Sequence, residues 1–397
     1  MDNLNLINTM DFSQNLSMEE AFALAEAEAK LNAALQAARQ RFNEAKIPDR
    51  YNEDWRFGQP AKHAVALAEI LETSAPARGS ISVKCADSEV VMPVSAEDAE
   101  LKETVNLMPT IGSDALLGLH IRRFGEGVCL MLEANTEIKQ PIIITYETDG
   151  LYTPYTFIMA APGAKARIEE HHKCADGATM FCVRNIHVME GARIAVELHE
   201  HGSIDSRCMN ITDIHNLGGA VQHFTSHAGH AWAREETIAE VYAASPGTSI
   251  ELYSANRISG NSVLDQHTHQ IHHIGGAKSN LLYKNVVDEN GTAIFAGNIR
   301  VEAGAHSTDA YQTNRNLLLS EKSTVHSLPG LEILADKVRC SHGSASSPVD
   351  EEALFYLTSR GVSRSHAQEL ISTGFLEDAY NKFRKSFDET YTSGLPD

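Results

Sequence analysis

Hydrophobic and polar residues alternate in short runs through the middle of this 397-residue chain, and glycines divide those runs into units of nearly constant length. The glycines stand 28 or 29 residues apart, at Gly163, Gly191, Gly219, Gly247, Gly276 and Gly304. An apolar residue stands five positions after all but the last of them: Ile168, Val196, Phe224, Leu252 and Leu281. A fixed period of this length is typical of a solenoid, and the alternation with frequent β-branched residues favours strands.

Glycine at the same place in every repeat indicates a corner, where the backbone turns and needs a positive φ. One coil cannot bury its apolar side alone, whereas stacked coils enclose a continuous core. We therefore predict a mainly β fold whose core is a right-handed parallel β-helix of about eight coils. Each coil should contain two or three strands. The six glycines should occupy equivalent corners, and the apolar residues five positions later should form one internal column.

Helical patterns flank the glycine-spaced repeat, which we call the ladder, on both sides. Ser17 followed by Glu20 is a capping box that predicts a helix over residues 17–46. Two further helices are predicted before the ladder, over residues 61–73 and 114–124. We divide the chain into three domains: a mainly helical N-terminal domain (1–118), the parallel β-helix (119–343) and a C-terminal helical domain (344–397).

The C-terminal domain is expected to hold three helices. The first begins at Asp350 with acidic residues, which the helix dipole favours at an N-terminus. The other two are predicted over residues 365–372, ended by Gly374, and over residues 375–387. Aromatic residues recur at helical spacing in the last helix: Phe375, Tyr380, Phe383 and Phe387. This stripe indicates either a surface for a partner or internal packing.

Charge and cysteine usage narrow the class of protein. The formal net charge is −20, which argues against binding nucleic acid or an anionic membrane surface. Six cysteines include no C-x-x-C pair, so no ready-made structural zinc site is indicated. Without a secretory signal or a long apolar run, we expect a cytoplasmic protein with free thiols.

Three stretches offer candidate metal ligands. The run from Asp265 to His273 places His267, His269, Ile271 and His273 on one face of a strand, where they could bind zinc or iron. Surface histidines or hydrogen-bonded corner histidines are the favoured interpretation. The stretch His171–Cys174 is a weaker candidate. Cys340 and His342 are two residues apart, so a strand would point a thiolate and an imidazole the same way. Such a pair suits iron, zinc or copper, but it supplies only two ligands, which suggests that a partner provides the others. The alternative is a buried cysteine beside a capping histidine.

Around Cys340 and His342 the chain resembles a known family. Residues 331–363 closely resemble the C-terminal signature of the SufB/SufD family of the SUF iron–sulfur cluster assembly machinery, and in particular its SufD branch. SufB-type chains carry Leu-Glu-His-Glu where this chain has Cys-Ser-His-Gly, and a scaffold cysteine in the region of residues 305–330, which contain none here. The match extends upstream through Asp265, His267, Thr268, His272, Ser279, Tyr283, Lys284, Phe295, Gly297 and residues 309–314.

The resemblance implies a β-helix core flanked by helical domains, within a heteromeric complex. SufB would bind at the end of the β-helix, and the SufC ATPase would bind the C-terminal helices; the chain alone could form a homodimer. The chain itself would not be an enzyme and would assist the step at which iron enters the complex. Cys340 and His342 would then be ligands for iron or an iron–sulfur cluster held transiently at the partner interface. No cofactor is expected to bind the isolated chain tightly, and no residue indicates a site for the reduced flavin associated with such complexes.

Three other functions are kept as alternatives. The chain could act as a direct scaffold, as SufB-type chains do. Parallel β-helices also act on polysaccharides through carboxylate clusters on one strand face, but no repeated Asp/Glu cluster is present in the ladder. The third alternative is a purely structural solenoid, which loss of cellular iron–sulfur enzyme activity on deletion would exclude.

Overall fold

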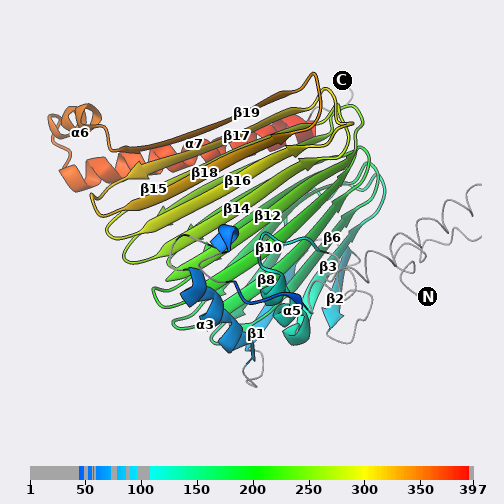
Figure 1. Cartoon of the computed structure of the whole chain (residues 1–397), viewed down its shortest axis with the longest axis horizontal. Helices are drawn as coiled ribbons and strands as arrows, with labels where there is room; N and C mark the ends of the chain where they lie inside the picture. Colours follow the sequence, from blue (N-terminus) through cyan, green and yellow to red (C-terminus); the bar gives the residue numbers. More distant parts are fainter. Residues whose placement is uncertain are drawn as a thin grey trace, which may run out of the picture.

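The fold was obtained as a computed structural model, which describes residues 44–48, 52–55, 57, 60–72, 78–85, 90–95 and 108–392. Within these residues the chain forms a parallel β-solenoid of about eight coils, and each coil contributes one strand to each of two sheets (Figure 1). The predicted mainly β solenoid is therefore confirmed. Its coils are built from two strands rather than three, apart from the short additional strand β5 (Leu151–Tyr152).

The two sheets follow the order of the coils. Sheet A contains, in spatial order, β1 (Gly79–Lys84), β4 (Ile142–Thr148), β7 (Lys165–Cys174), β9 (Arg193–His201), β11 (Ala220–Ala228), β13 (Ser249–Ile258), β15 (Lys278–Val287), β17 (Asp309–Leu318) and β19 (Arg339–Pro348). Sheet B contains β2 (Val91–Ser95), β3 (Glu126–Leu132), β6 (Tyr155–Ala160), β8 (Thr179–Val188), β10 (Arg207–Leu217), β12 (Trp232–Ala243), β14 (Val263–His272), β16 (Thr292–Val301) and β18 (Thr324–Ile333).

The two ends of the solenoid differ. At the first end, β1 pairs antiparallel with β4 and β2 pairs antiparallel with β3, so two short strands cover the first coil. The segment predicted to be mainly helical thus also contributes two strands to the sheets. At the other end, β18 and β19 are the last strands of their sheets. We call this second end the open end.

Four of the six ladder glycines have positive φ at the corners that precede strands of sheet A: Gly163, Gly191, Gly247 and Gly276. The prediction is wrong for Gly219 and Gly304. At the third corner the neighbouring Gly218 takes the left-handed conformation, with φ 107°. The glycine that begins this coil is therefore one residue earlier than the regular spacing predicts.

That one-residue slip changes which side chain enters the predicted internal column. Val196 pairs with His223, and His223 pairs with Leu252, so the column passes through His223. Phe224 lies on the opposite, outer face of the sheet, where it packs with Tyr253. Successive strand residues point to opposite faces, which explains why the slip places Phe224 outside the interior.

The C-terminal segment forms two helices rather than three. α6 (Glu351–Thr358) begins after Asp350, whose side chain accepts a hydrogen bond from the Glu352 amide at 2.9 Å. α7 (Arg364–Thr392) is continuous and lies along the outer face of sheet A (Figure 1). The predicted stop at Gly374 is wrong because a glycine inside a helix costs only about 1 kcal/mol, which packing against the sheet outweighs.

The aromatic stripe of α7 packs against the solenoid. Phe383 is buried and Tyr380 packs beside it, both against Phe224 and other residues of sheet A. Phe375 contacts a neighbouring apolar cluster near the start of α7. Internal packing is therefore the correct alternative for these three aromatic residues, and the side chain of Phe387 lies outside the described residues.

Short helices cover the outer face of sheet B near the first end. The 3-10 helix η1 (Glu53–Trp55), α3 (Pro60–Glu72) and α5 (Asp114–Arg123) contribute to one apolar cluster with residues of β8, β10 and β12. The predicted helices at 61–73 and 114–124 are thus confirmed, whereas the predicted helix over 17–46 lies almost wholly outside the described residues. No helix in the described part of the chain has both the length and the apolar character required to cross a membrane.

Candidate functional site

The open end presents the backbone edges of two strands. β18 and β19 each pair with one neighbour only, β16 and β17 respectively, within the described residues. Their side chains are mostly exposed or half-buried. Large apolar side chains are exposed on and beside these strands: Tyr311, Leu331, Ile333 and Leu334. Unpaired strand edges with exposed apolar residues are surfaces suited to pairing with another chain.

Cys340 and His342 both lie on β19, as the sequence predicts. Cys340 pairs in register with Ala310 and His342 with Gln312. The two residues alternate along the strand, so their side chains share one face. Cys340 is half-buried against a small apolar cluster, and His342 is exposed. Burial raises the pKa of the Cys340 thiol, and the charge of Asp309 adds to that rise, so a nearby cation would be needed to favour the thiolate.

The pair does not form a complete metal site. Within the described residues, Cys340 and His342 belong to no group of three or more His, Cys, Asp or Glu ligand atoms lying within 4.8 Å of one another. Iron and zinc in proteins usually take at least three protein ligands. The role of these two residues as ligands, and of a partner as the source of the remaining ligands, stays a prediction.

The histidine run on β14 is held by hydrogen bonds and ion pairs. His267 Nε2 lies 2.8 Å from Asp265, whose other oxygen accepts a hydrogen bond from Arg234 at 2.6 Å. His273 lies 2.6 Å from a carboxylate of β12. His267 and His269 line a cavity of about 310 Å³ on the outer face of sheet B. These contacts agree with hydrogen-bonded histidines, but the predicted surface or corner position is wrong for His267, which is buried within β14.

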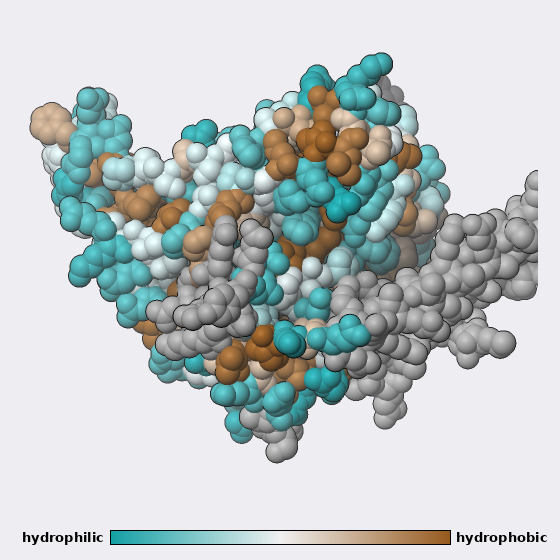
Figure 2. Space-filling view, in the orientation of Figure 1, coloured by the Kyte–Doolittle hydropathy of each residue, from teal (hydrophilic) through white to brown (hydrophobic). Residues whose placement is uncertain are grey.

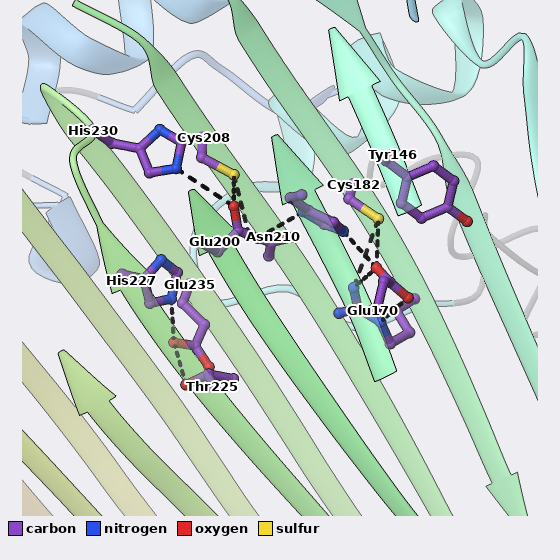
Figure 3. A network of polar contacts seen from close by, with 12 residues as sticks. Tyr146, Glu170, Cys182, Glu200, Cys208, Asn210, Thr225, His227, His230 and Glu235 are labelled. Carbon is purple, nitrogen blue, oxygen red and sulfur yellow. Dashed lines mark hydrogen bonds and ion pairs between the residues drawn. The ribbon is translucent and has the colours of Figure 1, made fainter. Parts of the chain in front are cut away.

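A polar cluster lies in the interior of the solenoid, beside the corner that leads from sheet A to sheet B (Figure 3). His172 connects two carboxylates, with its Nε2 atom 2.5 Å from Glu170 and its Nδ1 atom 2.6 Å from Glu200. Arg184 forms an ion pair with Glu170, and Cys208 donates its thiol proton to Glu200 at 2.9 Å. All five side chains are fully buried. We call these residues, with Cys182, Asn210 and His230, the interior cluster.

Charge pairing determines the protonation of the interior cluster. Burial alone would raise the pKa of Glu170, but Arg184 and His172 outweigh it and hold that pKa well below its usual range. Burial would also raise the pKa of Glu200, but the charge and hydrogen bond of His172 outweigh that effect and lower the pKa well below its usual value. The pKa of His172 is raised well above its usual value because the Glu200 carboxylate overcomes the effect of burial. Burial and Glu200 together raise the pKa of Cys208.

Polar side chains continue from the interior cluster toward the open end. Glu235 accepts hydrogen bonds from Gln266 at 2.8 Å and Thr225 at 3.2 Å, and it lies 3.1 Å from His227. A row of three amides and a hydroxyl follows along sheet A, with successive contacts of 2.7, 2.9 and 3.1 Å: Asn256, Asn285, Asn316 and Ser346. The interior therefore contains a polar line that reaches the last strand.

Sequence reasoning missed the interior cluster, although a signal was present. The inward positions of β7 begin with Ala166 and Ile168 and continue as Glu170, His172 and Cys174. Strict alternation along a strand predicts that these polar residues share the buried face of the apolar ones. Within the weaker candidate stretch His171–Cys174, His172 and Cys174 point inward, whereas His171 lies on the outer face.

The fold and these sites define a class: a two-sheet parallel β-solenoid with an open end that carries a thiol and an imidazole. Residues 143–375 match the family described as SUF system FeS cluster assembly, SufBD core domain. The chain belongs to this family.

Individual relatives support the same assignment. An iron–sulfur cluster assembly SufBD family protein of Synechocystis is 28% identical over 294 residues, which are 67% of this chain and 62% of the relative. The assembly protein SufD of Escherichia coli is 40% identical over 124 residues, 31% of this chain and 29% of the relative. The SufD of Bacillus subtilis is 26% identical over 332 residues, 77% of this chain and 73% of the relative. The chain thus spans less than two thirds of the length of the first two relatives.

Proposed function

We propose that this chain is a non-enzymatic component of an iron–sulfur cluster assembly complex, in which its open end binds a SufB-type partner. Cys340 and His342 would meet the partner at this interface and contribute ligands while iron enters the complex. Iron, or the cluster built from it, is here the cargo of the complex. The observation that carries the proposal is that both donors share one face of the edge strand β19, which pairs with β17 alone within the described residues.

The two ends of the solenoid support this position for the partner. β1 and β2 cover the first coil, whereas β18 and β19 leave backbone donors and acceptors available for a further strand. Exposed Leu331 and Leu334 add apolar surface beside the same edge. A partner that adds a strand here would shield the site from water and could complete the three or four ligands that iron requires.

The test uses the complex purified from the native cell, with Cys340→Ala and His342→Ala compared with wild type. Each variant should co-purify with the same partners but contain less iron and form clusters more slowly. His342→Ala should have the larger effect, because a partner can replace a thiolate more readily than an imidazole. Ser341→Ala is the matched control, because its side chain points to the opposite face of β19. Cluster formation at the wild-type rate in both variants would show that the pair is structural.

A second contact would bind a SufC-type ATPase through α6. This helix projects beyond the sheets at the edge of the molecule (Figure 1), and its Phe355 side chain is 74% exposed. The hydropathy surface shows this projection as an isolated apolar tip on a hydrophilic segment (Figure 2). Since the described part of the stripe on α7 is packed against sheet A, the exposed aromatic side chains among the described residues of the C-terminal domain lie on α6.

Phe355→Ala should weaken ATPase binding by about tenfold or more, as expected for an aromatic anchor at an interface. The control is Glu377→Ala, an exposed residue on α7 away from α6. Binding is measured with the purified chains by calorimetry. Equal affinities for the two variants would contradict docking through α6. Deleting residues 344–397 is a poor test, because it would cut β19 and uncover the outer face of sheet A.

A further inference from the structure

The interior cluster holds a set of metal-ligand atoms that the proposed function does not use. Nδ1 of His172, a carboxylate oxygen of Glu200 and Sγ of Cys208 all lie within 4.8 Å of one another. His230 approaches the same carboxylate, with its Nε2 atom 3.6 Å from Glu200 Oε2 (Figure 3). This buried nitrogen has no hydrogen-bond partner, and the ring is 4% exposed.

We propose that His172, Glu200, Cys208 and His230 form an interior site for one thiophilic divalent transition metal, Zn²⁺ or Fe²⁺. One thiolate, two imidazoles and one carboxylate are the ligand types that these ions accept in four-coordinate sites. Donor atoms around such an ion lie about 3.3 Å apart. The hydrogen-bonded contacts of 2.6 and 2.9 Å open by less than about 1 Å when the metal replaces their protons. His230 lies 3.6 Å from Glu200 but outside the group of atoms that are all within 4.8 Å of one another, so its ring moves toward His172 and Cys208 when it becomes the fourth ligand.

The residues around these donors are arranged as an outer shell. Glu170 accepts from Nε2 of His172, which forms the carboxylate–histidine arrangement that orients metal-binding imidazoles. Ser206 lies 2.9 Å from Nδ1 of His230 and leaves Nε2 directed at the site. Asn210 donates to Glu200 at 2.8 Å and holds the carboxylate in place. Asn210 also donates to Cys208 Sγ at 3.3 Å, so each of the four donors has a buried side chain that holds it.

Cys174 lies between the interior site and a groove that is open to solvent. Cys174 follows His172 by two positions on the same inner face, and it is 6% exposed. It lines an open groove of about 740 Å³ whose rim includes Glu147 and Asp149. Arg78 and Lys173 line the same groove, and Lys173 forms an ion pair with Glu147 at 2.6 Å, so Asp149 is the rim carboxylate that has no lysine partner among the described residues. The Cys174 thiol offers a transient ligand between this groove and His172.

The interior site is separate from the pair at the open end. Five strand-to-strand steps of sheet A lie between β9, which carries Glu200, and β19, which carries Cys340. At about 4.8 Å per step, the two positions are about 24 Å apart. The interior site and the proposed interface can therefore succeed or fail independently.

The test titrates Co²⁺ into the full-length, reduced, metal-free chain without oxygen. The wild type should bind one Co²⁺ and develop a thiolate-to-cobalt charge-transfer band together with the visible bands of four-coordinate cobalt. Cys208→Ser keeps a hydrogen-bonding group beside Glu200 and should lose the charge-transfer band. Cys182→Ala is the matched control, because it removes a thiol of the same cluster that is outside the proposed ligand set, and it should keep the band.

Two further variants separate the possible outcomes. His230→Gln should keep the band and weaken Co²⁺ binding by at least about tenfold. The double variant Cys340→Ala, His342→Ala should bind Co²⁺ in the interior as the wild type does. The proposal is overturned if the wild type shows no band even when Co²⁺ is present during refolding, or if Cys208→Ser retains the band. Loss of the band in the double variant alone would place the metal at the open end instead.

Discussion

The middle coils and the last coil of the solenoid share one strand architecture, but the middle coils bury charged side chains and the last coil exposes them. In the middle, Glu170, His172 and Arg184 are fully buried, and each of these three residues lies beside a residue of opposite charge. On the last coil, Arg339 is 75% exposed in its ion pair with Asp309, and His342 is exposed as well. An enclosed charge must be paired within the chain, whereas an exposed one can remain available to a partner.

This contrast is also visible in the strand edges. Each middle strand has a hydrogen-bonded neighbour on both sides, whereas β18 and β19 have one neighbour each within the described residues. Edge strands carry fewer constraints on sequence, and Pro329 lies within β18, where a missing N–H costs least. The middle of the molecule is thus self-sufficient, and the open end has the features of a surface that another chain completes.

The largest expected difference between the two regions is in the free energy of unfolding after one partner of an ion pair is removed. Arg184→Ala leaves Glu170 with less compensation and should lower the free energy of unfolding by about 3–5 kcal/mol. Arg339→Ala, at the exposed ion pair, should change it by less than about 1 kcal/mol. Denaturant unfolding followed by circular dichroism measures both.

A double variant tests the reason for that difference. Replacing Glu170 and Arg184 together with leucine removes both charges, and it should destabilise less than Arg184→Ala alone. If the double variant is the less stable one, the cost arises from lost packing rather than from an uncompensated carboxylate.

A second, smaller effect concerns the pH dependence that His223 imposes. Burial, followed by the charge of Arg184, lowers the pKa of His223 to about 4, and neither ring nitrogen has a hydrogen-bond partner. The unfolded chain, with a histidine pKa of about 6.5, binds the proton first. The contribution of His223 to stability is therefore present above pH 6.5 and is lost as the pH falls toward 4.

His223→Leu should reduce the loss of unfolding free energy between pH 7 and pH 4.5 by up to about 3 kcal/mol. The other inward residues of this column include Val196 and Leu252, so leucine suits the position. The control is His366→Leu, which removes an exposed histidine of α7. Parallel pH profiles for wild type and His223→Leu would refute a buried neutral imidazole at this position.

The smallest effect compares two glycines with equal space around them. A Cβ atom at Gly247 or at Gly343 would meet nothing within 4 Å, but Gly247 has φ +93° and Gly343 is on a regular strand. Gly247→Ala should therefore cost about 1–2 kcal/mol through backbone strain alone. Gly343→Ala should stay within about 0.5 kcal/mol. Equal midpoints in thermal unfolding would show that the corner can relax out of the left-handed conformation.

Periodicity predicted the architecture because a solenoid repeats one local pattern. The spacing of the glycines located the corners before β7, β9, β13 and β15, and the alternation of residues identified the strands. The prediction failed at the third corner, where two adjacent glycines could both fit the spacing, and at the sixth, where Ser307 rather than Gly304 has a positive φ. Only the hydrogen-bond register shows that Gly218 is the equivalent residue and that His223, not Phe224, faces the interior.

The candidate pair at the open end was predicted from its spacing on a strand, but the interior cluster was not. Cys340 and His342 are two residues apart in one strand, and local geometry alone places them on one face. The interior cluster joins His172 of β7, Glu200 of β9 and Cys208 of β10 with His230 near the start of β12. No local pattern connects residues that come from four different segments.

By itself the sequence determined the strand-rich repeat, the helical C-terminus and the donors on β19, because each depends on neighbours within a few positions. The tertiary structure decided that α7 runs unbroken through Gly374 and buries its aromatic stripe, since packing on sheet A outweighs a local glycine preference. It also decided which ionisable residues are enclosed together. Their charges are stabilised only by partners on other coils, and stacking of the coils brings those partners within hydrogen-bonding distance.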